Sequence, residues 1–251
     1  MLEIDVLASG SSGNCYLITD DRSAVFVDVG VNKKKLHCYQ NKLQNKKVSL
    51  FISHEHVDHI KGLKYFQSIF DGDIFCGFDT AKYLHDLGHD TANIKIIEPD
   101  HLFDFNKWQV YPFRLSHDSA DIFGFKFNFN NVLISFVTDT GEVSRDIFEI
   151  ITGSDILFLE ANYEEEMLVN GKYPQHLKKR ILSRKGHLSN KDAIKTIHEI
   201  YDRRLKKILF SHISEENNSY ELMEKYCKYC EKTFKVEATY IKQKTHYSFK
   251  V

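Results

Sequence analysis

The segment Leu50-Phe-Ile-Ser-His-Glu-His-Val-Asp-His59 decides both the fold and the chemistry of this chain. The apolar run Val48 to Ile52 predicts a buried strand. Four side chains that can bind metals follow it within six residues: His54, His56, Asp58 and His59. Crowded on one strand-to-helix turn, these groups would repel one another and lose hydration without compensation. A divalent cation compensates, and imidazole and carboxylate ligands suit zinc, iron or manganese. Because no cysteine is among them, a closed structural zinc site is disfavoured.

Composition indicates a folded globular chain. Of its 251 residues, 42% are hydrophobic and 27% are charged, close to the averages for such proteins. No charged-then-apolar leader and no membrane-length apolar run occur, so we expect a cytoplasmic protein without a membrane partner. Five scattered cysteines argue against a disulfide framework. Cys227 and Cys230 form one CxxC, but on an amphipathic stretch that favours core packing over redox or zinc chemistry.

Strand and helix patterns alternate along the whole chain. Short β-rich runs fill the first half, with helical patterns at 33–43, 59–70 and 80–87. Later helices are expected near 144–151, 163–169, 189–201 and 219–232, between strands near 156–160, 206–211 and 236–240. With only three prolines and no linker-like segment, we expect one domain, 1–251. Strand clusters with helices in both halves predict a layered α/β fold, with sheets packed face to face under helices.

The motif His54-x-His56-x-Asp58-His59 resembles that of the metallo-β-lactamase superfamily. Further strand ends follow in the expected order: Ser116-His117, Thr138-Asp139-Thr140-Gly141 and Phe210-Ser211-His212. The resemblance implies a four-layer αβ/βα sandwich holding two divalent metals, zinc first, with manganese or iron as alternatives. It places one metal on His54, His56 and His117, the second on Asp58, His59 and His212, with Asp139 bridging both. Asp28 matches the acidic residue that supports such ligands, although a simple turn aspartate fits equally well.

Four strings resemble the YycJ/WalJ branch of this superfamily: Leu7 to Asn14, Leu159 to Tyr163, Gly186 to Asn190 and Ser211 to Asn218. That branch is associated with 5′-to-3′ exonuclease action on DNA and with DNA repair. The resemblance therefore implies a dinuclear phosphodiesterase whose two metals hold a hydroxide. Asp58 would orient this nucleophile.

Glu160-Ala-Asn162 and Gly186-His-Leu-Ser189 are similar to segments of the tRNA 3′-processing endonucleases. The likeness implies that His187, oriented by Glu160, protonates the leaving oxygen, which suits a poor alkoxide leaving group. Asn162 and Leu188 depart from that pattern, and Glu160 could instead be a buried acid satisfied by the backbone. In the loop Ser9 to Gly13, backbone N–H groups could meet a phosphate. Ser9, Ser12 and Asn14 are therefore candidate substrate-binding residues, though a tight turn describes the loop equally well.

Positive charge concentrates between residues 168 and 210, a stretch with twelve Lys or Arg and only three acidic residues. This stretch predicts a face that attracts nucleic acid, with DNA as the expected partner; a solvated helix surface is the alternative. Two other functions remain open: a small-molecule hydrolase of the thioesterase or lactonase type, and a non-catalytic nucleic-acid-binding member of the fold. Oligomeric state is not indicated.

Overall fold

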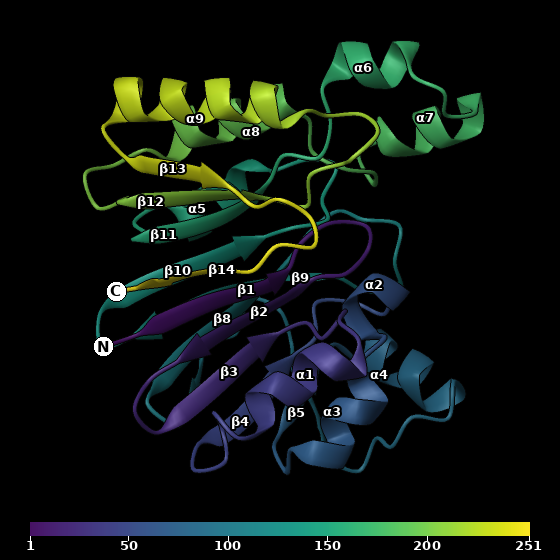
Figure 1. Cartoon of the computed structure of the whole chain (residues 1–251), viewed down its shortest axis with the longest axis vertical. Coiled ribbons are helices and arrows are strands. Elements are labelled where there is room, and N and C mark those ends of the chain that lie inside the picture. The colour runs from purple at the N-terminus through teal and green to yellow at the C-terminus, as the bar shows by residue number, and fades with distance from the viewer. The chain divides into compact units, whose positions relative to one another are not determined.

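Two seven-stranded mixed sheets, each with its own helices, make up the computed structural model, which describes residues 1–251 (Figure 1). Each sheet belongs to one of two compact units. The first unit comprises Met1–Glu98, Ser119–Ile122 and Gln243–Val251, and the second comprises Pro99–Asp118 and Phe123–Lys242. The predicted α/β class is confirmed. The expectation of a single domain stays a prediction.

The sheet of the first unit changes from antiparallel to parallel pairing at its middle strand, β3. Its order is β14-β1-β2-β3-β4-β5-β6, antiparallel up to β3 and parallel beyond it. The strands are β1 (Glu3–Ala8), β2 (Cys15–Thr19), β3 (Ser23–Val27), β4 (Lys47–Phe51), β5 (Ile74–Cys76), β6 (Ile94–Ile96) and β14 (Tyr247–Lys250). Parallel neighbours end at the same edge of a sheet, so Asp28 after β3 and His54 after β4 share that edge.

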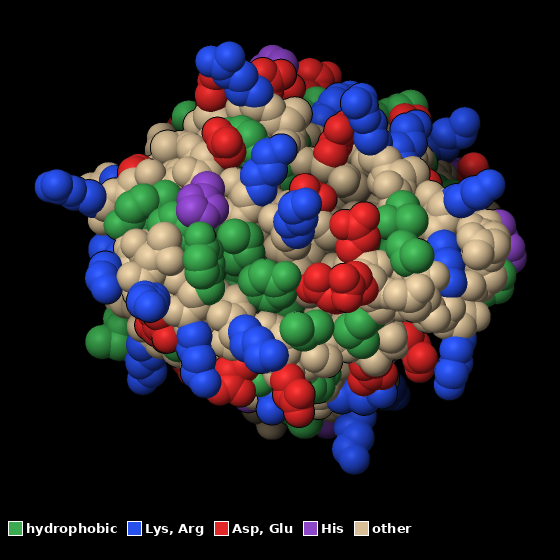
Figure 2. Space-filling model, turned by 90° about the horizontal axis from the view of Figure 1, so that it is seen from above, with side chains coloured by type: hydrophobic (Ala, Val, Ile, Leu, Met, Phe, Trp, Pro, Cys, Tyr) green, Lys and Arg blue, Asp and Glu red, His purple; other side chains and the backbone are tan.

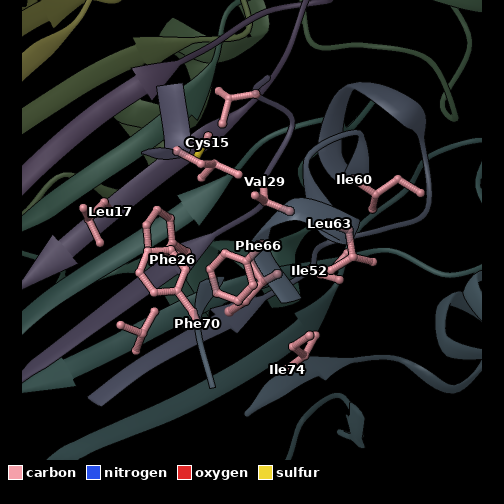
Figure 3. Close-up of a cluster of buried hydrophobic side chains, with 14 of the residues drawn as sticks. Cys15, Leu17, Phe26, Val29, Ile52, Ile60, Leu63, Phe66, Phe70 and Ile74 are labelled. Atoms are coloured by element: carbon pink, nitrogen blue, oxygen red, sulfur yellow. The ribbon is translucent and has the colours of Figure 1, made fainter. Parts of the chain in front are cut away.

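Four helices accompany this sheet: α1 (Lys33–Gln40), α2 (Val57–Ile60), α3 (Leu63–Ile69) and α4 (Phe78–Asp86). They bury Leu36, Leu63 and Phe66 against strand side chains in a single hydrophobic cluster, much of which Figure 3 shows. Phe26 of β3 meets Phe66 of α3 edge to face, with ring centroids 5.4 Å apart. Burying each such side chain contributes roughly 1.5–3 kcal/mol, so this cluster holds the metal motif's flanking elements in place.

The sheet of the second unit repeats the same pattern. Its order is β13-β12-β11-β10-β9-β8-β7, with β10 to β13 parallel and the remaining pairs antiparallel. The strands are β7 (Phe103–Phe105), β8 (Trp108–Arg114), β9 (Phe123–Phe129), β10 (Val132–Val137), β11 (Ile156–Glu160), β12 (Lys207–Ser211) and β13 (Glu237–Tyr240). Again the parallel strands bring their carboxyl ends together, here Asp139, Glu160 and His212.

Five helices belong to the second unit: α5 (Arg145–Ile151), α6 (Glu165–Asn170), α7 (Gln175–Ile181), α8 (Asn190–Ile200) and α9 (Tyr220–Phe234). α9 lies along β13 with α8 beside it (Figure 1). Cys227 and Cys230 are buried from α9 into the cluster that α5, α8 and α9 form on the sheet, as expected from the sequence. Burial raises the pKa of both thiols to about 12, so neither is a ready nucleophile or metal ligand.

Two details of the sequence expectation are wrong. The helix expected over 59–70 is two helices, α2 and α3, separated at Lys61 and Gly62. A Cβ at Gly62 would lie only 2.5 Å from the carbonyl oxygen of Val31. The break between the two helices therefore falls at a glycine against which the backbone of Val31 packs closely. In addition, helix α7 and the short strands β5, β7 and β14 were not expected. Among all the helices, none is long and apolar enough to cross a membrane.

Candidate metal centre

Each unit carries its own cluster of histidine and acidic side chains at the carboxyl edge of its sheet. In the first unit, His54 and His56 follow β4, and Asp58 and His59 lie in the first turn of α2. The ring of His54 lies 4.6 Å from that of His56 and 4.1 Å from that of His59, centroid to centroid. His54 and His59 are fully buried. The four predicted ligands of the motif therefore do converge.

Asp28 lies beneath this cluster and fixes the orientation of two of its imidazoles. Its Oδ2 accepts the Nδ1 proton of His59 at 2.7 Å and the hydroxyl of Ser53 at 2.9 Å, while Oδ1 accepts the Ser53 N–H at 2.7 Å. Since the Ser53 hydroxyl donates to Asp28, it accepts from Nδ1 of His54 at 2.9 Å. Both rings thereby carry their proton on Nδ1, which leaves the Nε2 lone pair for a metal. Ser53 is a supporting residue that the sequence analysis missed.

Asn14 contacts the same cluster from the loop after β1. Its Oδ1 accepts the N–H of Gly10 at 2.9 Å. Its Nδ2 therefore points toward Nε2 of His59, at 3.0 Å, and Oδ2 of Asp58, at 3.2 Å. Ser9 is buried, with its hydroxyl 3.1 Å from that of Tyr16. Ser12 is exposed and donates to Gln243. Of the three predicted substrate-binding residues, only Asn14 therefore lies against the metal motif.

The cluster of the second unit is centred on Glu160, which is fully buried at the end of β11. Its Oε1 lies 2.7 Å from Nδ1 of His187 and 3.0 Å from Nδ1 of His212. Its Oε2 accepts the backbone N–H groups of Thr140, at 2.8 Å, and Leu188, at 3.3 Å. One oxygen of Glu160 therefore accepts from the backbone while the other contacts two histidines, and the role of Glu160 in catalysis stays a prediction.

Charge in this cluster favours the ionised form of Glu160. Burial acts to raise the pKa of its carboxyl, but the charge and hydrogen bond of His187, together with the bond from His212, lower that pKa below its usual value. Asp139 adds a second carboxylate, with Oδ1 3.3 Å from Nε2 of His212 and 3.8 Å from Nδ1 of His187. Asp139, Glu160, His187 and His212 present their ligand atoms within 4.8 Å of one another.

His117, after β8, is held in a metal-ready tautomer. Its Nδ1 donates to the carbonyl oxygen of Gly186 at 2.9 Å, which leaves the lone pair on Nε2. Burial lowers its pKa, so the ring is neutral around pH 7. Asn162 donates to the backbone oxygen of His212 at 2.7 Å. This is the residue that departs from the endonuclease pattern. These two contacts restrict the positions of His117 and His212.

Backbone conformation singles out three of these strand ends. Asp28, Asp139 and His212 adopt left-handed conformations, with φ of 57°, 60° and 53°. For a residue with a side chain, this conformation costs roughly 1–2 kcal/mol. Such strain persists where the surrounding structure requires it, and it concentrates at functional sites. The donor set of neutral imidazoles and carboxylates, without a thiolate, fits a hydrolytic divalent metal such as zinc.

The positive charge of the predicted basic stretch is partly compensated by acidic side chains. Arg204 and Lys206 pair with Asp155 at 2.9 and 3.1 Å, and Arg184 lies 3.5 Å from Glu142. Arg180 pairs with Asp118, Lys207 pairs with Glu237, and Lys178 is buried. On the face that carries α9, Figure 2 shows Lys and Arg side chains mixed with Asp and Glu and no continuous basic surface. The nucleic-acid face predicted for 168–210 stays a prediction, and five of its twelve cations are paired with acids.

Comparison with known proteins identifies the class. Residues 27–213 match the β-lactamase superfamily domain, and the chain belongs to this family. It is an enzyme of a metal-dependent hydrolase family, as the motif implied.

Within that class, the chain is 34% identical to the exodeoxyribonuclease YycJ of Bacillus anthracis over 226 residues, 88% of this chain and 86% of that protein. It is 33% identical to the exodeoxyribonuclease WalJ of Streptococcus pneumoniae, over 86% of this chain and 83% of that protein. Its fold matches the metallo-β-lactamase fold protein YhfI of Bacillus subtilis with a TM-score of 0.73, 15% identity and 99% of each chain covered.

Proposed function

We propose that this protein is a dinuclear-metal phosphodiesterase that degrades DNA as a 5′-to-3′ exonuclease. The contact that carries the proposal is the 2.7 Å hydrogen bond between His187 and the buried carboxylate Glu160. A hydrolase of activated small molecules has little need of a proton donor, whereas phosphodiester cleavage releases a poor alkoxide. The names of the relatives YycJ and WalJ support the same substrate.

We propose further that the chain binds two divalent ions, with the ligands that the family resemblance implies. His54, His56 and His117 would hold one divalent ion, and Asp58, His59 and His212 the other, with Asp139 shared. Zinc is the first expectation, with manganese or iron as alternatives. Two such ions would supply an activated water as the nucleophile and would offset charge that develops on the phosphate.

The protein's own residues prepare this centre. Asp28 and Ser53 keep His59 and His54 protonated on Nδ1, so that both present Nε2 lone pairs. The carboxylate of Asp58 is partly exposed, with 27% of its side chain accessible. It can therefore orient the attacking oxygen and accept its proton. Asn14 donates to Oδ2 of Asp58 and so restricts this carboxylate.

His187 donates the second proton. Glu160 accepts from its Nδ1, which directs the ring, and Nε2 is left to protonate the departing sugar oxygen. His187 lies three residues before α8, whose N-terminus Ser189 caps by accepting the Asp192 N–H at 3.0 Å. The ring is 19% exposed, so a substrate can reach it.

One assay tests the proposal. Metal-loaded protein is incubated with 5′-labelled and 3′-labelled DNA and RNA, single- and double-stranded, beside an Asp58→Ala control and a panel of thioesters and lactones. We expect DNA cleavage with zinc or manganese that starts at the 5′ end and that the Asp58→Ala variant abolishes. Cleavage of thioesters or lactones alone would refute the nuclease assignment. DNA binding without any turnover would favour a non-catalytic protein.

A further inference from the structure

A basic cavity of about 520 Å³ lies wholly within the first unit, outside the predicted ligand set. Its polar lining comes from the loop after β1, from α1, from the end of α2 and from the segment before β14. The residues are Ser12, Asn32, Lys34, Lys35, Lys61 and Lys244. No acidic side chain lines it. Four ammonium groups around one hollow repel one another, so the cavity is suited to an anion.

Three of these lysines have no acidic partner. Lys35 and Lys61 instead donate to backbone carbonyl oxygens, of Leu7 and Ser12 respectively, and Lys34 is exposed. Lys42 and Lys95 of the first unit, by contrast, are paired with acids: Lys42 lies 3.2 Å from both Glu3 and Asp5, and Lys95 lies 2.9 Å from Asp73. The carbonyl contacts hold two of the ammonium groups in place while leaving their charge uncompensated. In the second half of the chain, by contrast, Arg204, Lys206 and Lys207 are paired with acids.

The N-terminus of α1 adds to this positive field. Its N-cap Asn32 accepts the N–H of Lys35 at 3.0 Å, and its first turn holds three lysines and no acid. Helices favour acids there, because the unsatisfied N–H groups already present partial positive charge. Lysines at that end are therefore unfavourable unless an anion binds, and helix N-termini are good anion sites.

The cavity lies next to the metal motif. Lys61 comes three residues after Asp58, a spacing that places Cβ atoms about 5–6 Å apart in a helix. Gly30, which also lines the cavity, packs so closely on Asp58 that a Cβ there would lie 1.6 Å from its carbonyl oxygen. A strand with one phosphodiester at the metal motif would thus bring a neighbouring phosphate to the lysines.

We propose that this cavity binds backbone phosphates of the DNA strand beside the scissile linkage. The inference rests on the nuclease activity proposed above and adds a substrate subsite to it. Non-bridging phosphate oxygens would accept from Lys34, Lys35 and Lys61, with Ser12 as a further donor. Such contacts carry no sequence information and set the position of the strand.

The salt dependence of binding tests this subsite. A single-stranded oligonucleotide with phosphorothioate linkages, which resists hydrolysis, is titrated onto the metal-loaded protein at several salt concentrations. Removing one lysine–phosphate interaction with a single strand lowers the slope of log K against log salt by about 0.7. We expect Lys34→Gln/Lys61→Gln to lower the slope by about 1.4 and Lys34→Gln alone, a change at an exposed side chain, by about 0.7.

Lys46→Gln/Lys47→Gln is the matched control. It removes the same charge at the start of β4, the opposite end of the strand that leads to His54, and Lys46 likewise contacts a backbone carbonyl. An equal decrease of slope in this control, or none in the cavity variants, would overturn the subsite. So would inorganic phosphate at millimolar concentration occupying the cavity without displacing the oligonucleotide. Failure of the wild-type protein to cut DNA would refute the nuclease proposal alone, because the slopes are measured without cleavage.

Discussion

Replacing Asp28 by Asn should weaken metal binding without unfolding the protein. Asp28 accepts three hydrogen bonds with its two oxygens, from the N–H and hydroxyl of Ser53 and from His59. Asn has a single acceptor oxygen, and its amide would face a donor. Losing one bond to a charged group costs roughly 1.5–3 kcal/mol. Removing outer support of ligating histidines lowers metal affinity roughly 10–100-fold, which is the same energy range, and we expect that loss here.

Asn is chosen because it tolerates the left-handed backbone at this position nearly as well as Asp does. Zinc affinity is measured by competition with a chromophoric chelator, and stability by thermal unfolding of the metal-free protein. Asp20→Asn is the control, since Asp20 also accepts three bonds, from Arg22 and Ser23, but at a turn before β3. If the Asp28→Asn variant holds zinc as tightly as the wild type, or if the control loses as much affinity, the assigned role of Asp28 is wrong.

Three further outcomes follow from the same structure. His187→Ala should slow DNA cleavage roughly 10²–10⁴-fold. It should barely affect cleavage of bis(4-nitrophenyl) phosphate, because the phenolate of that substrate leaves without a proton. Equal losses of activity on both substrates would exclude the acid role of His187. Removal of the metals should lower the thermal midpoint, because a metal present at about 1,000 times its Kd contributes about 4 kcal/mol; an unchanged midpoint in chelator would contradict a native-state metal centre. Burial acts to raise the pKa of Asp155, but the Leu133 N–H and the ion pairs with Arg204 and Lys206 lower it below its usual value. The stabilising effect of Asp155 should therefore be complete at neutral pH and disappear as the pH falls below about 4. If the Asp155→Asn variant and the wild type have the same stability at neutral pH and the same acid-unfolding curve, this role of Asp155 is refuted.

The metal motif was predictable because it is local. His54, His56, Asp58 and His59 lie within six residues after an apolar strand, so one strand-to-helix turn brings them together whatever the rest of the chain does. The core role of Cys227 and Cys230 was predictable for a similar reason, since helical spacing alone places them on the buried face of α9. Short-range periodicity decides both cases.

Long-range partners could not be predicted. β5 has three residues, too few to show an alternation, and β14 forms only by pairing with β1 at the other end of the chain. The charge balance of residues 168–210 looked strongly positive because Asp155 and Glu237, which neutralise several of its cations, lie outside it. Likewise, the sequence of the loop 9–14 does not reveal that the Asn14 amide turns toward His59.

The strained strand ends explain why so much of the candidate site depends on the sheets. Asp28, Asp139 and His212 each adopt the left-handed conformation directly after a parallel strand or one residue beyond it. That turn re-aims a side chain that would otherwise continue the alternation of the strand. At roughly 1–2 kcal/mol each, three such residues require strands whose register is fixed on both sides. β3, β10 and β12 meet this requirement because each is paired with two neighbours. The buried sheets therefore do more than carry the clusters, since their pairing stabilises backbone conformations that isolated segments would not adopt.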